Sequence, residues 1–138
     1  MGCKKIFLDA NIILDFLNKN RINHNKAKEL IYYLEVENYD IVISEDMITN
    51  IYYINKDKKQ VLSFIKEVII DSWEIVDFGL DIIKKATDYC IKNNSDLEDT
   101  LQCFCAKNNS CDIFLTSDKK FINCGIEILD YDGFLNSY

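Results

Sequence analysis

The chain has 138 residues, which is the size of one compact domain, so we treat residues 1–138 as a single domain and exclude an array of several. Hydrophobic residues make up 49% and charged residues 28% of the sequence, an ordinary globular composition that argues against a chain disordered throughout. The net charge is −7, so any binding of nucleic acid requires local basic groups, or metal ions that offset the acids.

Short runs rich in β-branched and aromatic residues alternate along the chain with longer runs of helical periodicity. We expect five strands, at residues 4–9, 39–44, 73–78, 111–117 and 126–131. We expect helices at residues 11–18, 24–39, 45–54, 57–71, 79–93 and 96–108, and a short helical turn at 119–123. Ser44 is the expected N-cap of the helix at 45–54. Because strands alternate with helices and are themselves largely apolar, we predict a three-layer α/β/α sandwich with a mainly parallel sheet of about five strands.

The sequence contains six cysteines and a single histidine, His24. Cys103 and Cys105 are two residues apart, so on a helix they point to different sides and do not share a metal ion easily. We expect reduced, mostly buried thiols. The first apolar run, residues 6–8, ends at Asp9 and is too short for a signal peptide or a membrane span. We therefore expect a cytoplasmic protein without membrane attachment.

Four acidic residues lie where a parallel sheet brings strand ends together. Asp9 ends the first strand and Asp118 follows the strand at 111–117, while Asp96 and Asp99 share one side of the first turn of a helix. Ligands of such sheets bind at the carboxyl ends of the strands. A cluster of carboxylates repels itself unless it binds a cation, and oxygen ligands without His or Cys favour Mg²⁺ or Mn²⁺. Such a site suits hydrolysis of a phosphodiester, because the metal activates a bound water.

Each acid also has an ordinary structural explanation. Asp9, Asp96 and Asp118 can favour the starts of helices, and Ser95 with Glu98 matches a capping box. Asp99 is the hardest to explain in this way, because its helix carries apolar residues on several sides and an acid there needs a partner.

Three segments of the chain resemble the PIN-domain family of ribonucleases, and most of all the toxin components of bacterial toxin–antitoxin pairs. The first is FLDANIILDFL and the second is ISEDMITNIYYI. The third and most specific is DLEDTLQCFCAKNNSCDIFLTSDKKF, which resembles the D-x-E-D-x-x-Q helix of the family followed by a strand and T-x-D-x-x-F. The resemblance extends from Lys5 to Phe121.

The resemblance implies a metal-dependent endoribonuclease that cleaves RNA with the help of Mg²⁺ or Mn²⁺. It also implies a small antitoxin protein as partner and a homodimer. The implied metal ligands are Asp9, Asp99 and Asp118, with Asp96 and Asn50 completing the catalytic set and Asn11 and Thr116 supporting it. Lys119 and Lys120 follow Asp118 directly, and we expect them to contact the phosphates of RNA.

Asn50 departs from the family pattern, because much of the family carries an acid in the middle of this helix. An amide oxygen can hold a metal or its water, but it contributes no charge. A second hypothesis is therefore a degenerate PIN domain that binds RNA or a protein partner without cleavage. A third is a phosphoryl-transfer domain of the haloacid-dehalogenase or receiver type. It fits poorly, because Asn11 stands where the dehalogenases have a second Asp.

Overall fold

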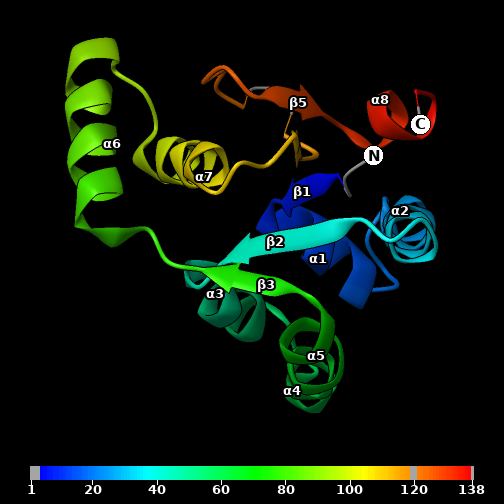
Figure 1. Ribbon diagram of the computed structural model, residues 1–138. Helices are drawn as coiled ribbons and strands as arrows, with labels where there is room; N and C mark the ends of the chain where they lie inside the picture. The colour runs from blue at the N-terminus through cyan, green and yellow to red at the C-terminus, as the bar shows by residue number, and fades with distance from the viewer. Residues whose placement is uncertain (1–3, 119–120, 138) are drawn as a thin grey trace.

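The structure is a computed structural model that describes residues 4–118 and 121–137. Its centre is a five-stranded sheet with the order β3-β2-β1-β4-β5, in which every neighbouring pair is parallel (Figure 1). The strands are β1 (Lys5–Leu8), β2 (Asp40–Ser44), β3 (Glu74–Val76), β4 (Ile113–Leu115) and β5 (Glu127–Leu129). The predicted parallel sheet of five strands flanked by helices is confirmed.

Helices cover both faces of the sheet, and their placement follows from the direction in which the chain moves. From β1 to β3 the chain steps one way along the sheet, and from β3 to β4 it steps back, so right-handed crossovers put the two groups of helices on opposite faces. Figure 1 accordingly shows α6 and α7 on one side of the sheet and α3, α4 and α5 on the other. The helices are α1 (Ala10–Leu17), α2 (His24–Val36), α3 (Asp46–Ile54), α4 (Lys58–Phe64), α5 (Ile70–Ser72), α6 (Gly79–Asn93), α7 (Leu97–Asn108) and α8 (Tyr131–Leu135).

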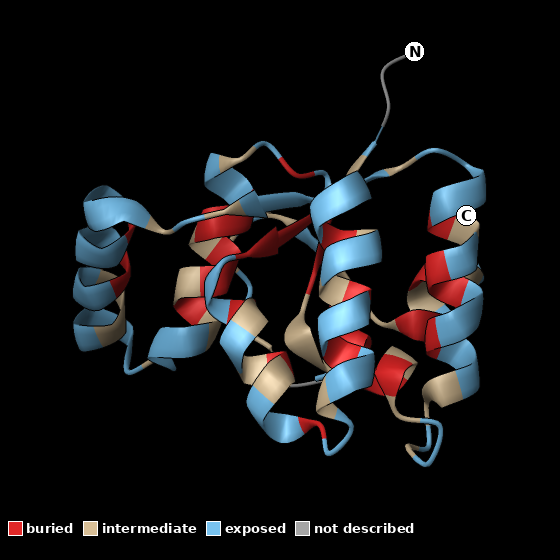
Figure 2. Ribbon diagram, turned by 90° about the horizontal axis from the view of Figure 1, so that it is seen from below, coloured by how far each residue is buried: buried red, intermediate tan, exposed pale blue. Residues whose placement is uncertain are grey.

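The central strands are buried on both faces, which explains their continuous apolar sequence. Ile6, Phe7 and Leu8 of β1 are fully buried, and the ring of Phe7 stacks on that of Phe114 in β4 at 5.1 Å between centroids. Figure 2 shows buried residues on the inward sides of the helices and exposed residues on their outward sides. Within the described ranges, no helix has the length and apolar character needed to span a bilayer.

The structure corrects several sequence expectations about individual elements. The helix expected at 57–71 is interrupted by a π-helical turn, η1 (Ile65–Ile69). Residues 121–123 are not helical, and the rest of the turn expected at 119–123 lies outside the described residues. Helix α8 was not predicted, because five residues are too few to show helical periodicity. Ser44 is not an N-cap: it ends β2, and Glu45 takes the cap position without a side-chain hydrogen bond.

A disulfide joins Cys103 of α7 to Cys124 in the segment before β5, with their Cα atoms 6.2 Å apart. The expectation of free thiols is therefore wrong for this pair, whereas Cys105 and Cys111 are free and buried. The bond could not be predicted from the sequence, because the whole of β4 lies between the two cysteines. Only the return of the chain past α7 brings them together.

A buried carboxylate ties three separate segments to one another. Asp15 of α1 is almost fully buried, and its two oxygens accept hydrogen bonds from Nε of Arg21 and from the hydroxyl of Tyr131, each at 2.7 Å. His24, the first residue of α2, places Nδ1 2.9 Å from the backbone carbonyl of Asp15. Because a buried charge is costly unless it is paired, these contacts fix α1, the start of α2 and α8 relative to one another.

We expect Tyr131→Phe to destabilise the protein by about 2 kcal/mol, because a buried carboxylate then lacks one of its hydrogen bonds. Urea unfolding of the wild type and the variant measures the loss. Tyr32→Phe is the matched control, since the Tyr32 side chain is 70% exposed. Equal stability of the two variants would show that the bond between Tyr131 and Asp15 contributes nothing.

Candidate functional site

The ends of the two most central strands meet at one edge of the sheet, where the strand order reverses between β1 and β4. Asp9 follows β1, and its Oδ2 accepts a hydrogen bond of 2.7 Å from the hydroxyl of Thr116, which follows β4. The same hydroxyl oxygen accepts a bond of 3.1 Å from the backbone N–H of Asp118. Oδ1 of Asp9 accepts the N–H of Ala10 at 2.8 Å, which caps α1. Thr116 therefore positions both acids of this edge at once.

Two further acids come from the first turn of α7. Asp96 is the N-cap, and its Oδ2 accepts the backbone N–H of Asp99 at 2.9 Å. The capping box expected between Ser95 and Glu98 is therefore wrong, because the cap belongs to Asp96. The structural explanation of Asp96 as a helix cap is confirmed, and this cap uses only one of its two carboxylate oxygens.

The pKa values show that the four predicted acids share one electrostatic environment. Burial, more than any other cause, raises the pKa of Asp99 to about 6. Neighbouring carboxylates raise it as well, in decreasing order Asp96, Asp118, Asp9 and Glu98. Burial also raises the pKa of Asp9, partly offset by the bonds from Thr116 and Ala10. The structure thus brings Asp9, Asp96, Asp99 and Asp118 to one place.

Two acids that sequence reasoning set aside also belong to this group. Burial raises the pKa of Glu98, and the charges of Asp46, Asp9 and Asp96 raise it further. Asp46 opens α3, so it reaches the same edge from the neighbouring strand β2. From sequence alone, Glu98 was explained by a capping box, and Asp46 was not among the predicted site residues. The alternating acids of D-x-E-D were the available signal for Glu98.

The remaining predicted residues lie around this acidic cluster, which we define as Asp9, Asp46, Asp96, Glu98, Asp99 and Asp118. Asn50 is half-buried on α3, and its Nδ2 lies 3.5 Å from Oδ2 of Asp46, one turn earlier. Asn11 is half-buried in the first turn of α1, two residues after Asp9. Lys119 and Lys120 lie outside the described residues.

Two buried polar atoms near the cluster have no hydrogen-bond partner among the described residues. One is the Oγ of Ser44, and the other is the Oε1 of Gln102. In the register of β1 with β2, Phe7 pairs with Val42, so Ser44 lies at the level of Asp9 on the adjacent strand. Gln102 lies one helical turn after Asp99 on α7. Buried orphan atoms of this kind call for water or a bound group, and sequence reasoning did not identify either.

The acidic cluster and the residues around it fit a hard divalent cation, since they offer carboxylate oxygens together with the hydroxyl of Thr116 and the amide of Asn50. Burial is the first cause of the raised pKa values of Asp99 and Asp9, and the repulsion between carboxylates that adds to it is the condition that a cation relieves. No three Asp, Glu, His or Cys side chains of the described residues form a finished metal site as they stand.

A parallel sheet with helices on both faces and acids clustered at its reversal point places this chain in the class of α/β domains whose site lies at the carboxyl ends of the strands. The profile of the PIN domain matches residues 6–126. The chain belongs to the PIN-domain family, whose ribonucleases use divalent metal ions.

A curated relative is Ribonuclease VapC1 of Aquifex aeolicus, which is 39% identical over 97% of this chain and 95% of its own length. The fold is similar to that of VapC20 of Mycobacterium tuberculosis, a toxin that cleaves the sarcin–ricin loop, with a TM-score of 0.71 and 12% identity over 88% of this chain and 95% of that chain. It is also similar to the fold in the structure of VapBC2 of Rickettsia felis bound to a promoter DNA fragment. The TM-score is 0.69 and the identity is 18%, over 91% of this chain and 98% of that chain. At such low identity, the two structures show the fold alone.

We expect the raised pKa of Asp99 to make the metal-free protein less stable as the pH increases. The folded state holds this proton more tightly than the unfolded chain, so the free energy of unfolding falls between about pH 4 and pH 6 and stays lower above. Asp99→Asn removes this loss. At pH 8 in chelator, the free energy of unfolding of the variant should exceed that of the wild type by on the order of 1 kcal/mol, because solvent screens part of the effect at this half-exposed residue. At pH 4 the difference should vanish.

Denaturant unfolding at a series of pH values checks this prediction. Asp88→Asn, on the exposed surface of α6, makes the same chemical change outside the acidic cluster and should have no such effect. A pH profile of Asp99→Asn that follows the wild type throughout would contradict the electrostatic strain assigned to Asp99.

Proposed function

We propose that this chain is a divalent-metal-dependent endoribonuclease that acts as the toxin of a toxin–antitoxin pair. The observation that carries the proposal is the acidic cluster at the reversal point of a PIN-domain sheet. The near full-length similarity to Ribonuclease VapC1 supports RNA as the substrate. Similarity of fold to VapC and VapBC proteins supports a small antitoxin as the partner. Such a protein works in the cytoplasm, where its RNA and its antitoxin are found.

The proposed metal ligands are Asp9, Asp99 and Asp118, and the ion is Mg²⁺ or Mn²⁺. When bound, this ion supplies a water of lowered pKa and positive charge against the scissile phosphate. Thr116 holds Asp9 through its hydroxyl hydrogen and the backbone of Asp118 through its hydroxyl oxygen, so it fixes the spacing of two ligands. We assign Asp96, Asn50 and Asn11 to the support of bound water around the ion.

The orphan atoms of Ser44 and Gln102 add to this arrangement. The hydroxyl of Ser44 lies beside Asp9 on the adjacent strand, where it can donate to a water or to a phosphate oxygen. The side chain of Gln102 lies one turn beyond Asp99 and presents an acceptor. Both atoms become satisfied when water or substrate enters the cluster, which favours a hydrated site.

A second candidate function is an RNA-binding or protein-binding PIN domain that does not cleave. The amide of Asn50 favours it, because this residue faces Asp46 and removes one negative charge from the cluster. The remaining carboxylates still outnumber those that one cation needs, so we give precedence to the nuclease. We also propose a homodimer, for which exposed apolar side chains such as Tyr53 and Leu62 supply contact area.

We expect the protein to cleave a mixed pool of structured RNA in Mn²⁺ or Mg²⁺ and not in chelator. Asp99→Asn should lower the cleavage rate at least about 100-fold, because a metal ligand stabilises the transition state by several kcal/mol. Gel analysis of the RNA pool measures the rates, and Asp88→Asn serves as the control. If the folded wild type cuts no RNA with either ion, the binding-only alternative is favoured.

We expect Asn50→Asp to tighten the binding of Mn²⁺ about tenfold, because it adds a negative charge to the cluster. Asp118→Asn should weaken binding by a similar or larger factor. Titration calorimetry measures both affinities. Asn38→Asp is the control, since it makes the same change just before the amino end of β2, at the opposite edge of the sheet. An unchanged affinity in Asn50→Asp would place Asn50 away from the ion.

A further inference from the structure

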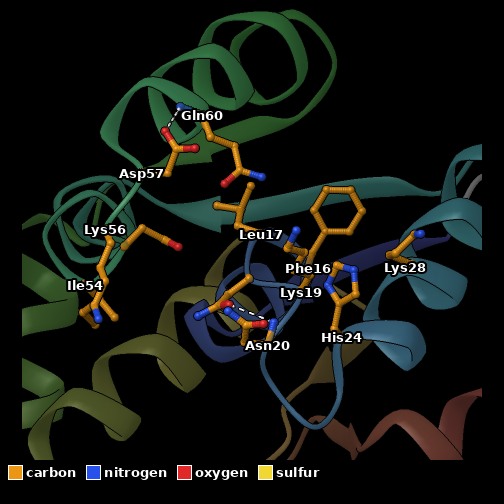
Figure 3. A pocket seen from close by; sticks show the side chains of 12 residues that line it. Phe16, Leu17, Lys19, Asn20, His24, Lys28, Ile54, Lys56, Asp57 and Gln60 are labelled. Atoms are coloured by element: carbon orange, nitrogen blue, oxygen red, sulfur yellow. Dashed lines mark hydrogen bonds between the residues drawn. The ribbon is translucent and has the colours of Figure 1, made fainter.

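A groove of about 840 Å³ lies outside the acidic cluster, at the far ends of α1 and α3 (Figure 3). The side chains of Lys19, Lys28 and Lys56 line it together with His24, and we call it the basic groove. Figure 3 shows Lys56 on one side and His24 and Lys28 on the other, with Phe16 between them. The groove is basic although the chain as a whole carries a charge of −7.

The three lysines of the basic groove are not engaged elsewhere. Lys19, Lys28 and Lys56 form no ion pair within residues 4–118 and 121–137, whereas four other basic residues do. These four are Lys5, Arg21, Lys26 and Lys85. The one acid that lines the groove, Asp57, already accepts the N–H of Gln60 as the cap of α4. Against the single negative charge of Asp57, the groove therefore carries three lysines that form no salt bridge with the described residues, which leaves it with a net positive charge.

Other groups in the groove suit a nucleic-acid chain. The ring of Phe16 is half-buried at the wall, where a base can stack on it. His24 uses Nδ1 at the carbonyl of Asp15, so its Nε2 is left to face the groove. The amides of Asn18 and Asn20 add donors that can reach phosphate or base oxygens.

Two helices lead from the acidic cluster to the basic groove. Helix α1 begins directly after Asp9 and ends at Leu17, which lines the groove. Helix α3 begins at Asp46 and ends at Ile54, which also lines it. At a rise of 1.5 Å per residue, each helix spans about 12 Å. The groove therefore lies a few nucleotides away from the acids.

We propose that the basic groove binds the phosphate backbone of the RNA strand next to the bond that is cut. This inference rests on the proposed function and adds to it a second contact site on the same substrate. The acidic cluster repels phosphates by itself, so an enzyme with this charge distribution needs cations along the path of the strand. The three lysines of the lining favour a polyanionic RNA strand over an uncharged peptide segment.

Fluorescence anisotropy of labelled single-stranded oligouridylate, in chelator so that no strand is cut, tests the proposal. The groove variant carries Lys19→Gln, Lys28→Gln and Lys56→Gln. Its slope of log affinity against log salt should be less steep than that of the wild type by about 2, since each single-strand phosphate contact contributes about 0.7. At low salt its affinity should fall at least about tenfold.

A control variant of equal net charge carries Lys66→Gln, Lys84→Gln and Lys92→Gln on η1 and α6, outside the groove. It should keep the wild-type slope, and urea unfolding should show that both variants are folded. If the groove variant binds RNA like the control variant, the proposal is wrong. If it instead loses binding to a polyglutamate peptide while RNA binding stays unchanged, the groove receives an acidic peptide and the proposal is also overturned.

This binding assay separates the inference from the proposed function. A wild type that binds RNA through the groove but cuts no RNA in Mn²⁺ supports the groove and contradicts the nuclease. A wild type that cuts RNA while its groove variant keeps the full salt slope supports the nuclease and overturns the groove.

Discussion

The hydrogen bond from Thr116 to Asp9 joins the ends of the two central strands where the direction of the sheet reverses. The positions of Asp9 and Asp118 depend on this contact. The bond partly offsets the rise that burial causes in the pKa of Asp9, and the same hydroxyl group fixes the backbone of Asp118. The helix that carries Asp96 and Asp99 then packs against a frame that is already set. The neutral side chain of Thr116 thus positions the acidic residues Asp9 and Asp118.

The acidic cluster is a source of instability in the metal-free protein, and other parts of the fold compensate for it. Burial, with a smaller contribution from repulsion between the acids, raises the pKa values of Asp9, Glu98 and Asp99, which means that their charged forms are disfavoured. The buried network around Asp15 and the apolar strands supply stability nearby. Under the proposed function, a cation that binds the cluster would stabilise the folded domain, which would couple metal binding to folding.

Features that depend on local sequence patterns could be predicted, whereas contacts between segments that are distant in the sequence could not. Asp9 and Asp118 could be identified because parallel strands place their carboxyl ends at one edge. Asp96 and Asp99 followed from helical spacing. The bond of Cys103 to Cys124 and the orphan hydroxyl of Ser44 could not be predicted, because each depends on how the chain returns over α7 or on which strand lies beside β1. The basic groove could not be predicted for the same reason, because its lysines come from three separate segments of the chain.

The charge distribution explains how an acidic domain can act on a polyanion. A net charge of −7 repels RNA at long range, but salt screens that repulsion beyond about 10 Å. At shorter range the local groups decide, and here unpaired lysines lie at one end of α1 and α3 and carboxylates at the other. On the proposed path, a strand that enters along these helices would meet the lysines first and the acids last. A cation held by Asp9, Asp99 and Asp118 would offset the repulsion between these acids and the phosphates, and so would favour the approach of the strand to the cluster.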